Sequence, residues 1–452
     1  MAGNCRQKDF NMKINKGRLL EMLHDLKDFT DTPGNGVTRF SFGVQDATAR
    51  EYILERAVDA GCTIDIDALQ NIRIGLKTNT PDKNIVMAGS HIDTVRHGGW
   101  LDGIYGVCSA LEVMLTLSEY TDAAMAGDKS VLSLDDLKAN YEMVIFSEEE
   151  GSNFGSTMTG SKFVTGFYKE EDLGKLRDDR GKTLRQRLIE LPIKEDEDED
   201  ALDVYSMDYF DSGEILWDFD EIKTMLELHI EQGPVLDSEG LSIGIVDAIY
   251  GMKVIEVTLT GVGNHAGATP MGIRYDALCT AAECVLATEE IVKSDEEERI
   301  VATIGKLSVF PDCSNVIPQE VKFTVEVRDK DEAKINEYMD SIISRIHEIA
   351  DARQVSCDIC EVSKSSPLYL TKSLKDDMEK LAKDKGLAYK VMDSGAVHDA
   401  CMIANFVDTG MIFVPSIDGR SHVPEEDTNE NDLITGAQFL LDIVLNEMKT
   451  EV

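Results

Sequence analysis

The chain alternates short apolar runs with amphipathic stretches, a pattern typical of an α/β protein. Apolar positions recur at helical spacing over residues 14–29 and 47–60. Open α/β sheets bind ligands at the carboxyl ends of their strands. Ionisable residues follow four apolar runs of strand length: residues 85–88 precede His91, 143–146 precede Glu148, 225–228 precede His229, and 411–414 precede the loop that ends at His422. These runs predict a site where the four strands end.

The pattern changes between about residues 244 and 362. Residues 254–259 and 321–327 alternate like half-buried strands, and residues 275–292 and 334–350 have helical spacing. A chain of 452 residues also exceeds the roughly 250–300 that one hydrophobic core usually serves. We therefore predict a discontinuous α/β domain, residues 1–245 and 363–452, with helices around a central mixed sheet, and an inserted α+β domain, residues 246–362.

Composition narrows the function classes. The 85 acidic residues against 45 lysines and arginines give a net charge of −40, which disfavours binding to nucleic acid or to anionic membranes. Apolar runs are too short to cross a bilayer, and the N-terminus lacks an apolar signal core, so we expect a cytoplasmic protein. The nine cysteines follow no disulfide framework, which fits free thiols in that compartment. The acidic run at 194–203 is typical of a solvated surface loop.

Histidine placement gives the first chemical clue. Of eight histidines, six lie in glycine-rich or acid-rich segments: His91, His97, His229, His265, His398 and His422. The segment GSHIDTVRHGGWLDG supplies His91 and, eleven residues later, Asp102. Asp93 is placed to accept the imidazole N–H of His91 that would face away from a metal. By itself this segment fits a turn-rich surface loop equally well.

Three consecutive carboxylates follow a strand in the segment FSEEEGSNFG. Burying such a run without a cation is costly, so these side chains are either solvated or face a metal. In the second case one glutamate can coordinate while its neighbour activates water. Together with His229 and His422 this is the inventory of a hydrolytic zinc site with one or two ions. No H-E-x-x-H motif and no nucleophile elbow occurs.

Seven motifs, in the same order along the chain as in a known enzyme family, show a resemblance to that family. The segments GSHIDTVRHGGWLDGIYGV, EEGSNFG, LHIEQG, NHAGATPM, NVIPQEVKF, SGAVHDA and GMIFVPSIDGRSHVPEE resemble the binuclear zinc amidohydrolases of the hydantoinase/carbamoylase type, within the aminoacylase/carboxypeptidase superfamily. That group includes N-carbamoyl-L-amino acid amidohydrolases, allantoate and ureidoglycolate amidohydrolases and β-ureidopropionases. The match spans roughly residues 15–450. It implies a zinc-peptidase-like catalytic domain and an inserted lid and dimerisation domain.

The resemblance also implies roles for individual residues. Two divalent ions would be bound per chain, zinc first, with manganese, cobalt or nickel as alternatives. Asp102 would bridge them, and Glu149 would be the general base on the bridging water. His91 and His229 would bind one ion, and Glu150 and His422 would bind the other. His265, from the partner subunit in relatives, would stabilise the oxyanion. Gln232, Asn315 and Arg328 would bind the substrate carboxylate, and Asp93 and His398 would support the metal ligands.

The expected activity is hydrolysis of the N-carbamoyl C–N bond of a carboxylate-bearing substrate, such as an N-carbamoyl-L-amino acid or allantoate, by a homodimer joined through the inserted domain. One alternative is an aminoacylase or dipeptidase of the same superfamily. Another is a binding protein without turnover, but such a protein would not need Glu149 as a general base. Three positions depart from the family pattern: Asn153, Ala268 and Val397. Glu148 receives no role.

Overall fold

The computed structural model describes residues 12–81, 83–126, 137–190, 217–296 and 299–449. The chain divides into two compact units. The first unit comprises residues 1–247, 370–392 and 398–452, and the second comprises residues 248–369 and 393–397. The predicted boundaries were 245/246 and 362/363. The acidic run at 194–203 lies outside the described residues.

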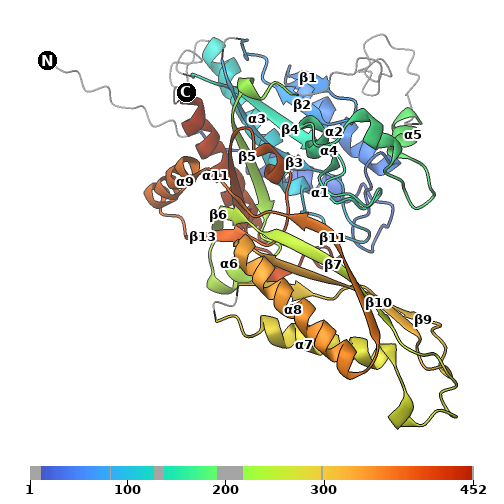
Figure 1. Ribbon diagram of the computed structural model, residues 1–452. Helices are drawn as coiled ribbons and strands as arrows, with labels where there is room; N and C mark the ends of the chain where they lie inside the picture. Colours follow the sequence, from blue (N-terminus) through green and yellow to red (C-terminus); the bar gives the residue numbers. More distant parts are fainter. Residues whose placement is uncertain (1–11, 82, 127–136, 191–216, 297–298, 450–452) are drawn as a thin grey trace. The chain divides into compact units, whose positions relative to one another are not determined.

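The larger sheet has nine strands among the described residues, in the order β1-β2-β4-β3-β5-β14-β6-β12, with β13 beside β6 (Figure 1). Its strands are β1 (Thr63–Ile66), β2 (Ile72–Gly75), β3 (Ile85–His91), β4 (Asn140–Phe146), β5 (Ile222–Ile230), β6 (Ile243–Ile249), β12 (Leu368–Tyr369), β13 (Tyr389–Ser394) and β14 (Asp408–Val414). The sheet is mixed, since β1–β2 and β6–β14 are antiparallel pairs.

The helices of the first unit pack against this sheet. They are α1 (Lys16–Lys27), α2 (Val44–Asp59), α3 (Ile104–Met125), α4 (Thr159–Val164), α5 (Leu184–Ile189), α6 (Val235–Glu239), α9 (Lys372–Lys385), α10 (Ala400–Ile403) and α11 (Glu430–Lys449), with the 3₁₀ turns η2 (Glu170–Gly174), η4 (Phe219–Glu221) and η6 (Ile417–Gly419). The longest of them, α3, is buried along most of its length. No helix among the described residues is long and apolar enough to span a membrane.

Four adjacent parallel strands, β4-β3-β5-β14, form the centre of the sheet. Every residue of β3 is buried, because helices cover both faces, and this explains the unbroken apolar runs in the sequence. The register pairs His91 with Phe146 and His229 with Phe413. All four strands therefore end at one edge, as the sequence predicted.

The second unit is an antiparallel sheet packed on two helices. The strand order is β11-β7-β10-β8, with β9 also paired to β10. Alternate residues of β7 and β10 face α7 and α8, which explains their period-two pattern. The elements are β7 (Gly251–Thr260), η5 (Met271–Ile273), α7 (Ala277–Val292), β8 (Val301–Thr303), β9 (Leu307–Phe310), β10 (Glu320–Asp329), α8 (Glu332–Ala352) and β11 (Ser356–Ser365). The predicted α/β class with an α+β insert is confirmed.

Candidate active site

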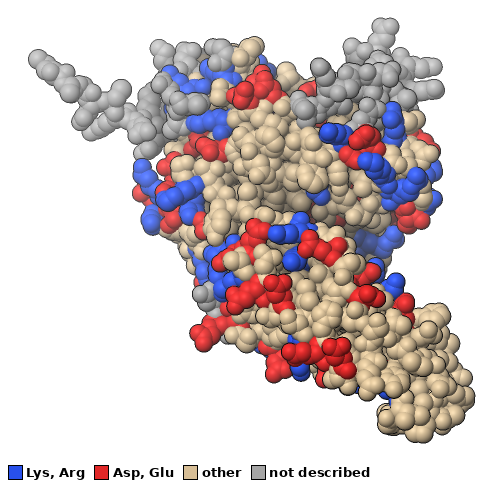
Figure 2. All heavy atoms as spheres, in the orientation of Figure 1, with Lys and Arg blue, Asp and Glu red and all other residues tan. Residues whose placement is uncertain are grey.

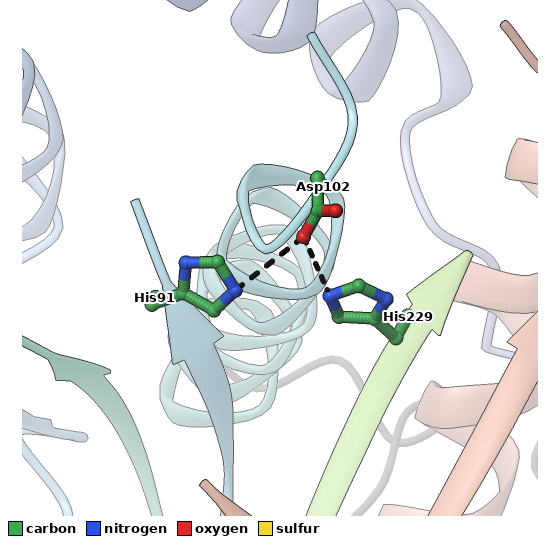
Figure 3. A group of neighbouring side chains, drawn as sticks. All are labelled: His91, Asp102 and His229. Carbon is green, nitrogen blue, oxygen red and sulfur yellow. Dashed lines mark ion pairs between the residues drawn. The ribbon is translucent and has the colours of Figure 1, made fainter. Parts of the chain in front are cut away.

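Two strand ends and one helix start bring His91, His229 and Asp102 together (Figure 3). His91 is the last residue of β3, His229 lies at the end of β5, and Asp102 lies two residues before α3. Asp102 Oδ1 lies 3.1 Å from His229 Nε2 and 3.5 Å from His91 Nε2. All three residues are buried. Their ligand atoms converge on a volume the size of a metal ion.

Main-chain carbonyls fix the orientation of both imidazoles. His91 Nδ1 lies 3.1 Å from the Asp93 carbonyl oxygen, and His229 Nδ1 lies 2.9 Å from the Ile230 carbonyl oxygen. Each Nδ1–H donates there, which turns the Nε2 lone pair inward, as a metal ligand requires. Gly103 donates its N–H to His229 Nε2, and a Cβ at Gly103 would lie 2.4 Å from the His91 ring. Only glycine at this position leaves room for the His91 ring.

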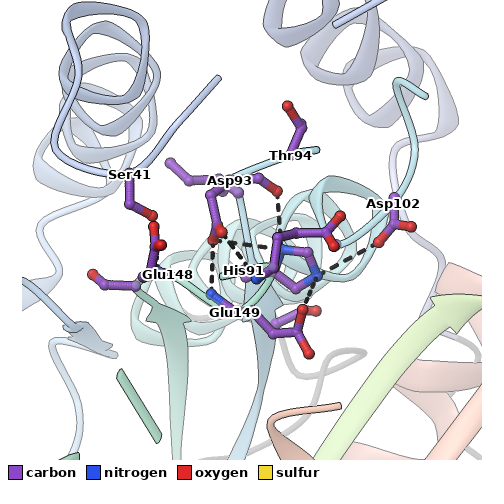
Figure 4. Close-up of polar contacts among 12 residues, drawn as sticks. Ser41, His91, Asp93, Thr94, Asp102, Glu148 and Glu149 are labelled. Carbon is purple, nitrogen blue, oxygen red and sulfur yellow. Dashed lines mark hydrogen bonds and ion pairs between the residues drawn. The ribbon is translucent and has the colours of Figure 1, made fainter. Parts of the chain in front are cut away.

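Asp93 supports the site differently from the prediction. The sequence predicted that its carboxylate accepts the His91 N–H, but the carboxylate oxygen is 3.6 Å away and the carbonyl oxygen is closer. The Asp93 carboxylate instead accepts the backbone N–H groups of Glu149 at 3.2 Å and Glu150 at 3.1 Å (Figure 4). Asp93 thus ties the end of β3 to the loop after β4.

A second group shares Asp102. His422 Nε2 lies 3.2 Å from Asp102 Oδ2 and 3.5 Å from Glu150 Oε1. Asp102 therefore presents Oδ1 to His91 and His229 and Oδ2 to His422. A carboxylate with one oxygen toward each of two ligand groups has the geometry needed to bridge two ions.

Glu148 and Glu149, the first two of the three glutamates after β4, point in different directions (Figure 4). Glu148 adopts a φ of 56°, and its carboxylate accepts the N–H groups of Asn153 and Phe154, so it shapes the loop rather than facing the site. Glu149 Oε2 lies 3.8 Å from His91 Nε2. Asn153 donates its side-chain amide to the Ser41 carbonyl at 3.0 Å.

Burial sets the charges of these groups. It raises the pKa of Glu149, and burial together with Asp102 raises the pKa of Glu150 to about 8. Burial would raise the pKa of Asp102 as well, but the imidazoles, His229 first, outweigh it and hold that pKa well below its ordinary value. The hydrogen bond to Asp102 raises the pKa of His422 to about 9. Without cations the cluster therefore retains protons that divalent ions would displace.

The donor set fits two divalent ions. It offers imidazole nitrogens and carboxylate oxygens, which suit zinc, manganese and nickel. Among the described residues, the buried side-chain atoms without a hydrogen-bond partner include Glu149 Oε1, Glu150 Oε1 and Gln232 Oε1 beside this cluster, and bound ions or substrate would satisfy them there.

Comparison with known families agrees with this geometry. Residues 87–446 match the model of peptidase family M20/M25/M40, which covers most of the chain. The chain belongs to this family. It is a hydrolase, and the predicted resemblance to hydantoinase/carbamoylase enzymes is confirmed.

Three M20/M25/M40 relatives are informative. An N-carbamoyl-L-amino-acid amidohydrolase of Paenarthrobacter aurescens is 33% identical over 96% of this chain and 98% of its own length. An allantoate amidohydrolase of Escherichia coli is 32% identical, covering 93% of this chain and 95% of its own. The crystal structure of an amidase of the hydantoinase/carbamoylase family from Burkholderia multivorans has a TM-score of 0.83, 30% identity, and coverage of 98% and 100%.

Two further predicted residues lie beside the ligand groups of this M20 chain. Gln232, with φ 58°, donates its side-chain amide to Asp102 Oδ2 at 2.7 Å. The buried His398 ring packs edge-on against His229, with centroids 4.7 Å apart. Burial, with His229 next, lowers the pKa of His398 well below its ordinary value, so it is neutral. His97 instead contacts Asn35 and is not part of the cluster.

His265, Asn315 and Arg328 belong to the second unit. His265 is exposed, and its Nδ1 accepts the N–H groups of Gly267 at 3.1 Å and Ala268 at 3.2 Å, which leaves the ring hydrogen on Nε2. The Asn315 carbonyl accepts the N–H of Ala266 and so keeps Asn315 beside His265. Arg328 donates to Glu326 at 2.6 Å and to the Gly395 carbonyl at 2.9 Å.

Two buried glutamates that touch the site's loops were missed from the sequence. Glu227 accepts from Ser90 Oγ, next to His91 in the sequence, and from the N–H of Ala400, which lies two residues after His398. Glu426 accepts the N–H of Asp102. Their only sequence signal is position: Glu227 lies two residues before His229 on a buried strand, and Glu426 lies four residues after His422.

Proposed function

We propose that this protein is a metal-dependent amidohydrolase that cleaves the N-carbamoyl C–N bond of a carboxylate-bearing ureido substrate. The observation that carries the proposal is Asp102, which offers one oxygen to each of two ligand groups while Glu149 lies beside them. In the proposal, His91 and His229 hold one ion and Glu150 and His422 hold the other. The names of the relatives support a ureido substrate.

A ureido carbon is a poor electrophile, and water is a poor nucleophile at neutral pH. Bound metal ions would polarise the carbonyl and lower the pKa of water toward about 7. Glu149 would take a proton from the attacking water and deliver it to the departing nitrogen. The C–N bond then breaks to give the free amine and carbamate, which decomposes to ammonia and CO2.

Residues of the second unit would serve binding and charge stabilisation. The Nε2–H of His265 is suited to donate to the oxyanion that forms on the carbonyl oxygen, because its Nδ1 is already an acceptor. Arg328 and Asn315 would bind the substrate carboxylate, for which the planar guanidinium offers parallel donors. Gln232 would contribute from the first unit.

A homodimer through the second unit is part of the proposal. Large apolar side chains are exposed on α7, β8 and β9, including Leu286, Val301, Leu307 and Phe310. Figure 2 shows the surface around β9 with few charged residues, in contrast to the mixed charges elsewhere on that face. Apolar patches of this kind mark protein interfaces. In the dimer His265 would reach the partner's site.

A substrate panel tests the proposal. Protein reconstituted with zinc, manganese, cobalt or nickel is incubated with N-carbamoyl-L-amino acids, allantoate, N-acetyl amino acids and dipeptides, and ammonia and free amine are measured. Ammonia from ureido substrates supports the proposal. Amine from acetylated substrates or dipeptides, without ammonia from ureido ones, would favour the aminoacylase or dipeptidase alternative.

A further inference from the structure

Glu426 connects the two loops that carry Asp102 and His422. It is 1% exposed, and its carboxylate meets four donors. Oε1 accepts the N–H groups of Leu101 at 2.9 Å and Asp102 at 3.1 Å. Oε2 accepts from the His422 N–H at 3.3 Å and lies 2.8 Å from Ser421 Oγ, whose one hydroxyl hydrogen it shares with Asp102 Oδ2 at 3.0 Å. One side chain thus fixes two loops that are more than 300 residues apart in the sequence.

The surroundings are built for a carboxylate. A Cβ at Gly99 would lie 1.9 Å from Glu426 Cδ and 2.0 Å from Oε1, so only glycine leaves room for the side chain. Within the part of the chain that the structure describes, no lysine or arginine pairs with Glu426. Only a carboxylate has two oxygens that both accept and neither donate, which is what donors on two sides require.

The two ligand groups depend on Glu426 unequally. His91 and His229 lie on strands of the central sheet, and main-chain carbonyls orient their rings. His422 lies on a loop, its own φ is 60°, and its side chain is 47% exposed. The loop around His422 is therefore the less constrained part of the site, and Glu426 bonds directly to its backbone.

We propose that Glu426 is a positioning residue that holds Asp102 against His422 and so sets the affinity of the ion bound by Asp102, Glu150 and His422. This inference rests on the proposed function, since it needs two ions. Loss of Glu426 should weaken that ion selectively, because the His91 and His229 side of Asp102 has its own supports.

The test uses Glu426→Gln and Glu426→Ala in metal-free full-length protein titrated with Zn²⁺ against a chromophoric chelator. Gln keeps one acceptor for the Leu101 and Asp102 amides but turns a donor toward the His422 N–H. We expect about a tenfold loss of affinity for one ion with Gln and about a hundredfold loss with Ala, with the other ion within about threefold of wild type. If the Ala variant fails to fold, Gln carries the test.

Glu112→Gln is the matched control. Glu112 lies on α3 and is also buried, but it accepts from the Asn15 N–H, Thr116 Oγ1 and Arg18 rather than from the loops that carry Asp102 and His422. This variant should lower the melting temperature and leave both ion affinities unchanged. Gly99→Ala should reproduce the selective loss, and adding it to Glu426→Ala should cost little more, because both changes break the same contact.

Two outcomes separate the claims. A wild type with two bound ions whose Glu426 variants keep both affinities, or lose both equally in step with melting temperature, would overturn the positioning role alone. A wild type that binds fewer than two ions would overturn the proposed function and this role with it.

Discussion

Replacing Glu149 by glutamine separates base catalysis from metal binding. Glu149 is 6% exposed, its Oε2 lies 3.8 Å from His91 Nε2, and its backbone N–H is fixed by Asp93. Glutamine has the same shape and backbone anchor, so the loop should keep its position. Burial raises the pKa of Glu149, which favours the neutral form of the side chain in metal-free protein, so replacement by a neutral amide should cost little stability.

The expected loss lies in turnover. A positioned general base contributes about 10² to 10⁴ in rate, equivalent to roughly 3–5 kcal/mol of activation free energy. We therefore expect kcat for ammonia release to fall at least about a hundredfold in Glu149→Gln, with two ions retained. Glu150→Gln should instead lose the ion shared with His422, because Glu150 Oε1 faces that imidazole.

Glu148→Gln is the control within the same triplet. The Glu148 carboxylate binds the Asn153 and Phe154 amides through one oxygen, which glutamine retains, so we expect less than about a tenfold change in kcat. Steady-state ammonia release and metal analysis are measured on all three variants. Turnover above about a tenth of wild type in fully metallated Glu149→Gln would refute its role as the base.

Three further predictions concern binding, assembly and pH. Arg328→Lys should raise KM for carboxylate-bearing substrates by about tenfold with a smaller change in kcat, since an ammonium cannot reproduce the guanidinium fork; unchanged kinetics on every such substrate would exclude Arg328. Mixing His265→Ala with Glu149→Gln protein should restore activity at about a quarter of the sites after subunit exchange. About half the dimers are then mixed, and one of the two sites in each mixed dimer has both Glu149 and His265 intact. Verified exchange without recovery would mean that His265 does not act across a dimer. Apparent zinc affinity should rise between about pH 6 and about pH 9 and then level off, because Glu150 and His422, with pKa values of about 8 and 9, bind metal only after losing protons. Calorimetry in buffers of different ionisation enthalpy should detect the release of these protons. An affinity that does not change with pH would contradict this prediction.

Much of the fold follows from local pattern. Buried parallel strands are continuous apolar runs, so the ends of β3, β4, β5 and β14 were visible in the sequence. Alternation in β7 and β10 revealed a sheet packed on one face only. The approximate position of the site followed because parallel strands deliver their ends to one edge.

Contacts between distant segments could not be read in this way. No local pattern indicates that Glu426 accepts the amides of Leu101 and Asp102, because that pairing depends on how two loops fold back. For the same reason the sequence did not show that the Asp93 carboxylate accepts amides of the loop after β4, or that the Asp93 carbonyl is the nearer acceptor for His91. Nor does spacing reveal that Asp102 divides its oxygens between two groups.

The central claim is that two ions sharing Asp102 activate water for ureido hydrolysis. Its most direct test is a titration of metal-free protein with Zn²⁺ or Mn²⁺, in which bound metal and ammonia release from an N-carbamoyl-L-amino acid or allantoate are measured at each step. We predict that activity reaches its maximum at about two ions per chain and is abolished by chelation and restored by metal. Full activity in chelated protein, or no ammonia from either ureido substrate at two bound ions, would contradict the account.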